Sequence, residues 1–218
     1  MKKLILWLIL ALTVVLAIGF AWWWFDGRWR PKTITKHQAE IAALLDRAGW
    51  VAPGNSGPRL YMIGFRSCPD CIRYRAEEFP KLLKAGVDIR LIMVARRDRN
   101  GVVRSSPAER TTVAELWLNR RWELAERWWD ADLETWIAGD IRPADGDTAR
   151  TAVVEAGRDF VDELAPLLAD NGVRGGDGRY PTLIWWTKDG VMRACVCERP
   201  QTWRFVRAEV GVKRPVTY

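Results

Sequence analysis

The 218-residue sequence has little histidine and no phosphate-binding loop. Its single histidine, His37, is too few for a histidine-rich metal centre, and no motif for a histidine-based hydrolase surrounds it. The glycines of residues 172–178 lack the strand, turn and helix with a lysine that a phosphate loop needs. No dense basic run is present either. The formal net charge of +7 comes from 34 Lys and Arg residues interleaved with 27 Asp and Glu residues. We therefore interpret it as solvated surface and expect no nucleic-acid partner.

The overall composition is that of a folded chain. Hydrophobic residues make up 49%, charged residues 28% and aromatic residues 11% of the sequence, which excludes a disordered chain. The apolar residues are mostly scattered among charges, so a protein with many membrane spans is excluded as well. Apart from one terminal segment, the chain has the length of about one domain with a sizeable core.

That terminal segment is residues 4–25, which carry no charged side chain. As a helix, the run would span the roughly 30 Å hydrocarbon core of a bilayer. A cleaved signal peptide is the alternative, but its apolar core would be shorter and its small residues would lie at the polar end. Here the small-residue triplets 17–19 and 19–21 lie inside the run, which continues to residues 22–25 (Trp-Trp-Trp-Phe). We predict an uncleaved transmembrane anchor over residues 1–26, with lipid contacts through its aromatic end.

Basic residues lie on both sides of the anchor, so local charge does not set its orientation. The commoner arrangement for such anchors exports the large domain. Residues 27–56 are predicted to be a linker and an amino-terminal helix over residues 33–50, a segment that could drive oligomerisation. The remainder, residues 57–218, is predicted to be one α/β domain.

Within this domain the apolar patterns predict alternating elements around a central sheet. A helical block fills residues 107–172, between the second and third strands. The predicted strands are residues 60–65, 87–94, 180–186 and 191–197, and the predicted helices are residues 72–85, 153–168 and 201–210.

The four cysteines carry the chemistry. Cys68 and Cys71 form a Cys-Pro-Asp-Cys motif at a strand-to-helix junction, where the helix amino terminus stabilises a thiolate. The spacing lets the second thiol reach back across one turn and resolve a mixed disulfide with a substrate. A zinc site that combines this pair with Cys195 and Cys197 is the alternative reading of the same spacing.

The sequence resembles the thioredoxin-like superfamily, in particular the exported thiol–disulfide interchange proteins of bacteria. Residues 65–71 look like the active-site turn of that family, residues 180–183 like its cis-proline loop, and residues 188–190 like the following hairpin turn. Pro80 falls where the active-site helix of the family kinks. The helical block before the proline strand is similar to the insertion of the Dsb-type oxidoreductases. The resemblance implies a thioredoxin-like fold over roughly residues 57–210.

The resemblance also implies roles for the residues of the proline loop. Pro181 would be cis and would hold a backbone edge beside Cys68, so that Tyr180, Pro181 and Thr182 bind the substrate chain. Cys197, two residues after Cys195, would lie near the first cysteine pair. The second pair has three possible readings: two small buried residues, a second redox pair that exchanges with the first, or half of a zinc site.

Residues in and around the motif would tune the chemistry. The negative charge of Asp70 disfavours a thiolate at Cys68, whereas Arg66 and Arg73 are close enough in sequence to offset it. Pro69, Asp70 and Arg66 are therefore the expected modulators of the pair, and the charge of Asp70 favours a reductase or isomerase over a strong oxidase.

We therefore expect a membrane-anchored thiol–disulfide oxidoreductase in the bacterial inner membrane, with its catalytic domain in the periplasm. Its partners would be cysteine-containing exported proteins and a membrane redox partner. The chemistry implies no organic cofactor and no catalytic metal. The alternative function is a non-catalytic zinc-binding or assembly module built on the same fold from the four cysteines.

Overall fold

The computed structural model describes residues 2–173 and 179–212, which form two units, Met1–Pro31 and Lys32–Tyr218. The first unit is the helix α1 (Lys2–Phe25) followed by one turn of 3-10 helix, η1 (Gly27–Trp29). Ile5–Trp29 has a mean hydropathy of 2.6 and its apolar window is not buried within the protein. By length and composition, this segment can cross a membrane.

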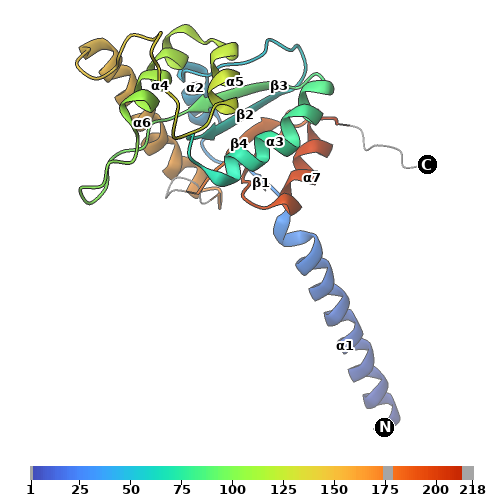
Figure 1. Ribbon diagram of the computed structural model, residues 1–218. Coiled ribbons are helices and arrows are strands. Elements are labelled where there is room, and N and C mark those ends of the chain that lie inside the picture. The colour runs from blue at the N-terminus through green and yellow to red at the C-terminus, as the bar shows by residue number, and fades with distance from the viewer. Residues whose placement is uncertain (1, 174–178, 213–218) are drawn as a thin grey trace. The chain divides into compact units, whose positions relative to one another are not determined.

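The second unit is built on a five-stranded sheet with the order β1-β5-β4-β2-β3 (Figure 1). Only β2 and β3 are parallel, and the other neighbours are antiparallel. The parallel pair with its connecting helix forms one half of the sheet, and the β4–β5 hairpin with the helix that follows forms the other. The strands are β1 (Lys32–Thr33), β2 (Arg59–Gly64), β3 (Asp88–Met93), β4 (Thr182–Trp186) and β5 (Met192–Val196).

Helices cover both faces of this sheet (Figure 1). On one face lie α3 (Pro69–Lys84) and α7 (Pro200–Glu209), joined by the edge-to-face rings of Tyr74 and Trp203 at 5.3 Å and by an ion pair between Glu78 and Arg207. On the other face lie α2 (Gln38–Arg47) and α6 (Thr148–Ala169). The α/β sandwich expected from the sequence is therefore present.

The segment before β2 belongs to this second unit. Thr33 pairs with Arg193 in β5, and the α2 residues Ile41, Leu44 and Leu45 are buried in the common core. The helix expected over residues 33–50 is shorter, because residues 32–34 follow the edge of β5 and the helix starts only at Gln38. Residues 32–56 therefore contribute a strand as well as the expected helix to the fold.

The helical block is also more broken than its apolar pattern suggests. It contains α4 (Pro107–Asn119), α5 (Trp122–Asp130) and α6, while residues 131–147 form turns. Asp132 accepts hydrogen bonds from the backbone of Glu134 and Thr135, and Asp147 caps α6 by accepting one from the backbone of Arg150. Such short acidic side chains satisfy backbone donors outside helices, which ends one helix and begins the next.

Candidate functional site

Cys68 and Cys71 form a disulfide at the amino terminus of α3, with Cα atoms 5.2 Å apart. Cys68 is the N-cap residue, and its Sγ accepts a hydrogen bond of 3.0 Å from the backbone N–H of Cys71. Pro69 occupies the first helical turn, where its missing N–H costs no intrahelical bond. The chain thus places Cys68 Sγ at the positive end of a 16-residue helix.

The peptide bond between Tyr180 and Pro181 is cis, as the resemblance implied. Pro181 directly precedes β4, and its carbonyl oxygen accepts a hydrogen bond of 2.8 Å from the backbone N–H of Cys197. The ring of Tyr180 meets that of Phe65, at the start of the cysteine turn, edge to face at 5.3 Å. The proline loop therefore contacts both the turn that carries Cys68 and the segment that carries the second cysteine pair.

The sheet register places both cysteine pairs on one face. Met62 pairs with Leu183, and Leu183 pairs with Cys195, so their side chains point to the same side. A Cβ atom built on Gly64 would lie 2.9 Å from Cys71 Sγ and 3.9 Å from the Met62 side chain. Cys71 therefore lies over the same face as Cys195, the face that α3 and α7 cover.

Cys195 and Cys197 form the second disulfide, with Cα atoms 5.3 Å apart. The carbonyl oxygen of Cys197 accepts a hydrogen bond of 2.7 Å from Trp203 Nε1, and both cysteines are buried. Ile63, Thr182 and Val196 lie side by side on adjacent strands. One residue further along these strands, Gly64, Pro181 and Cys197 lie side by side in the same way. The cis proline thus stands between the strand end that Cys71 covers and Cys197.

Arg73 connects the two regions. Its Nη2 lies 2.8 Å from a carboxylate oxygen of Asp70 and 2.6 Å from the carbonyl oxygen of Glu198, the residue after Cys197. The sequence predicted that Arg66 and Arg73 offset the charge of Asp70, and Arg73 does so directly. Arg66 instead donates to the backbone carbonyls of Trp128 and Ala131, at the end of α5. Its buried guanidinium therefore anchors the helical block to the turn before Cys68 rather than pairing with Asp70.

Sequence reasoning overlooked two polar residues close to this turn. Arg96 lies over the ring of Phe65 at 4.2 Å and donates to Ser67 Oγ at 2.9 Å. Glu109, in the first turn of α4, is buried, and this burial raises the pKa of its carboxyl. Neither position carries a sequence signal, because an arginine after a strand and a glutamate at a helix start are both typical of solvated surface.

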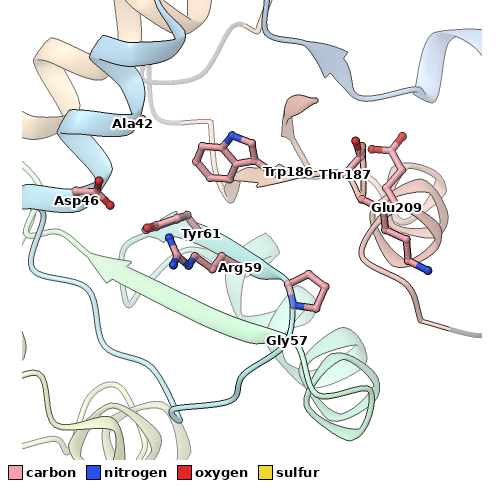
Figure 2. Close-up of a pocket in the computed structure, with 10 residues that line it drawn as sticks. Ala42, Asp46, Gly57, Arg59, Tyr61, Trp186, Thr187 and Glu209 are labelled. Carbon is pink, nitrogen blue, oxygen red and sulfur yellow. The ribbon is translucent and has the colours of Figure 1, made fainter. Parts of the chain in front are cut away.

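A cavity of about 540 Å³ has none of the four cysteines in its lining (Figure 2). It is lined by Arg59 and Tyr61 near the start of β2 and by Trp186 at the end of β4. The cysteine turn follows the opposite end of β2. Within residues 2–173 and 179–212, no group of three or more metal-ligating side chains is placed to hold a metal ion. The four cysteines form two separate disulfides.

Four features define a thioredoxin-like fold: the strand order, the parallel β2–α3–β3 unit, the β4–β5–α7 unit and the cis proline beside a Cys-x-x-Cys pair. Among solved structures, the chain is similar to Proteus mirabilis ScsC in a compact conformation, with 14% identity, 98% of each chain covered and a TM-score of 0.46. It is also similar to Chlamydia trachomatis DsbA, with 13% identity, 74% of this chain and 89% of that chain covered, and a TM-score of 0.28. No family model and no curated protein matches the sequence. The fold assignment therefore rests on the topology of the chain itself.

Proposed function

We propose that this protein is a thiol–disulfide oxidoreductase whose reactive pair is Cys68 and Cys71. The observation that supports the proposal is the position of this disulfide, at a helix amino terminus and beside the cis proline loop. A helix amino terminus stabilises a thiolate, which is the attacking species in disulfide exchange. The loop of Tyr180, Pro181 and Thr182 is the proposed substrate-binding edge.

In the reductive direction, the Cys68 thiolate attacks one sulfur of a substrate disulfide. A mixed disulfide forms and the second substrate sulfur leaves as a thiolate. Cys71 then attacks Cys68 Sγ, which releases the first substrate sulfur and forms the Cys68–Cys71 disulfide. Two electrons have passed to the substrate, and a dithiol of a membrane redox partner restores the protein by the same two exchanges in reverse.

The proposed direction is that of a reductase or isomerase. Asp70 places a carboxylate in the first turn of α3, and a negative charge close to Cys68 disfavours its thiolate. Because a less stable thiolate makes the disulfide less oxidising, the pair is expected to be more reducing than a strong oxidase. The ion pair with Arg73 partly balances this charge, and both side chains are about 40% exposed, so the effect is screened.

The proposed location is the bacterial inner membrane, with α1 as a single anchor and the cysteine domain in the periplasm. The apolar segment Ile5–Trp29 supports the anchor. Disulfide exchange on exported proteins fits an oxidising compartment, in which cysteine-containing substrates need correction. Substrates would thus be exported proteins with cysteines.

The test is a redox titration of the full chain in detergent, with Cys71→Ser as the trapping variant. Free thiols are counted by mass after alkylation in graded glutathione buffers. We expect a reversible two-thiol transition at Cys68 and Cys71, and mixed disulfides with peptides that accumulate in the variant because no thiol resolves them. A Cys68→Ser variant is the control and should trap nothing.

Two outcomes would contradict the proposal. A potential of about −120 mV, that of the strong oxidant DsbA, would exclude the reductive direction. Four thiols that stay protected together until a chelator is added would favour the zinc-binding module instead.

The same titration tests the second cysteine pair, which we propose as an additional redox pair. The observation that supports it is the shared sheet face and the hydrogen bond from Cys197 to Pro181. A second two-thiol transition that disappears in a Cys195→Ala and Cys197→Ala double variant is expected. If these two cysteines stay oxidised in every buffer, the second disulfide is structural.

A further inference from the structure

A second cavity, of about 200 Å³, borders the proline loop on the side of Tyr180. Its lining contains five arginines and two aspartates. Arg96, one of the five, donates to Ser67 Oγ, the residue directly before Cys68. Tyr180, directly before the cis proline, forms part of the wall. The cavity is therefore bounded by the residue before the cis proline and by an arginine that contacts the residue before Cys68.

The arginines of this cavity differ in their partners. Arg97 is ion-paired to three carboxylates of α6: Glu155, Asp159 and Asp162. Arg158 is held by Glu155 and by two backbone carbonyls. These two side chains are satisfied by the protein itself, so they are part of the wall rather than of a binding site.

Arg104 and Arg96 are less completely paired. The guanidinium of Arg104 has no hydrogen bond or ion pair to any residue that the structure describes, although its backbone N–H donates to Asp98 and its carbonyl oxygen accepts from Arg96. Arg96 keeps one buried donor, Nε, without a partner. Burial lowers the pKa of Arg96, and the neighbouring charge of Arg104 lowers it further. The charge of the nearby Glu109 carboxyl raises the pKa of Arg96.

Tyr180 adds a neutral donor beside these charges. Burial raises the pKa of its hydroxyl to about 12, so it stays protonated at neutral pH. The charges of Arg104 and Arg96 also act on this hydroxyl, as does the carboxylate of Asp162. Two arginines and a tyrosine whose charges and hydroxyl act on one another thus line a cavity of side-chain size. An arginine fork and a hydroxyl donor are suited to a carboxylate.

We propose that this cavity is a specificity subsite that binds a carboxylate side chain of the substrate, with Arg104 and Arg96 as its ligands beside Tyr180. The inference rests on the proposed function, since the substrate chain is taken to lie along the proline loop. Peptides with Asp or Glu near their cysteine are then the preferred substrates.

The test compares matched peptides with the full chain in detergent. Each peptide carries one cysteine as a mixed disulfide with a chromophoric thiol, and Glu or Gln is scanned over the neighbouring positions. For each peptide, the second-order rate constant with the reduced protein is divided by that with dithiothreitol. This ratio removes the effect of Glu on the intrinsic reactivity of the peptide disulfide. We expect Glu to exceed Gln by about two- to fivefold at one position, because an exposed to half-buried ion pair contributes up to about that factor.

Two variants and one control assign the effect. Arg104→Gln should bring the Glu-to-Gln ratio close to one, and Arg104→Glu should favour Lys peptides. Arg121→Gln removes an exposed arginine at the start of α5 and should keep the wild-type ratio. Added salt should lower the wild-type ratio, since it screens the attraction. Glutathione and its ethyl ester, compared in the same assay, show whether the carboxylate of a small thiol also binds.

The outcomes separate this inference from the proposed function. A wild-type ratio near one at every position, with all peptides still consumed in a Cys68-dependent reaction, would overturn the subsite alone. A ratio that survives in Arg104→Gln would also overturn it. If no peptide reacts faster with the wild type than with Cys68→Ser, the oxidoreductase itself is excluded.

Discussion

At the scale of single residues, the absence of a side chain at Gly64 allows the Cys68–Cys71 disulfide to lie against the sheet. Gly64 ends β2, and Cys71 Sγ occupies the space that a Cβ atom would need, at 2.9 Å. By contrast, Met62 and Leu183 carry large, buried side chains on the same face of the sheet. A small residue at this one position therefore brings Cys71 close to the strand that pairs with the cis proline loop.

We predict that Gly64→Ala lowers the free energy of unfolding by about 1–3 kcal/mol, the usual cost of overpacking a core. The cause is the contact with Cys71, whose Sγ and Cβ atoms cannot both move away without shifting α3. Guanidinium denaturation of the oxidised protein in detergent measures the change. Gly139→Ala is the matched control, because a Cβ atom there has no neighbour within 4 Å. Equal effects of the two substitutions would contradict the explanation.

At the scale of elements, the buried cation of Arg66 joins the helical block to the turn before Cys68. Arg66 is 4% exposed and donates to the carbonyls of Trp128 and Ala131 at the end of α5, with a longer bond of 3.3 Å to Trp129. These carbonyls are among the last of a helix, which have no intrahelical partner. The side chain thus satisfies the end of α5 and holds the turn that leads into Cys68.

We predict that Arg66→Lys lowers the free energy of unfolding by about 1–3 kcal/mol. A lysine has no planar fork, so it cannot satisfy the same carbonyls, and a buried acceptor is left without a donor. The control is Arg75→Lys, whose partner Asp130 is 66% exposed and whose ion pair is worth at most about 1 kcal/mol. Thermal unfolding of both variants measures the difference. A loss in Arg75→Lys as large as that in Arg66→Lys would exclude the capping role.

At the scale of the whole molecule, the chain combines an apolar helix with one folded unit that begins at Lys32. At the carboxyl end of α1, the guanidinium of Arg28 lies 3.7 Å from the ring centre of Trp24 and 4.4 Å from that of Trp29. Tryptophan and arginine together are typical of the membrane–water boundary. The composition of this first unit is thus that expected of an anchor.

We predict that the full chain stays in the membrane fraction after alkaline extraction, and that a Val14→Arg and Val15→Arg double variant is released. Each arginine near the centre of a spanning helix costs about 2.5–3.5 kcal/mol. A Val14→Leu and Val15→Leu double variant is the control and should remain in the membrane. Mass measurement of the wild type identifies the alternative: a soluble protein that lacks its first residues would mean that the segment is a cleaved signal.

From the sequence alone, the motif Cys68–Cys71, the proline loop and the order of most strands and helices of the domain were predictable. These features are local: a helix start beside a cysteine, or an apolar run between turns, is specified by neighbouring residues. The cis bond at Pro181 was predictable only through the resemblance. The limits of α2 were not, because residues 32–34 gain more by pairing with β5 than by extending a helix.

What only the tertiary structure decided is which distant side chains meet. The sheet register places Cys195 and Cys197 on the face of Cys71, and Arg66 is turned toward α5 rather than toward Asp70. The cavity of Arg96, Arg104 and Tyr180 joins two loops that are more than seventy residues apart in sequence. Such contacts depend on strand order and helix packing, which bring together residues whose local patterns indicate only exposed charge.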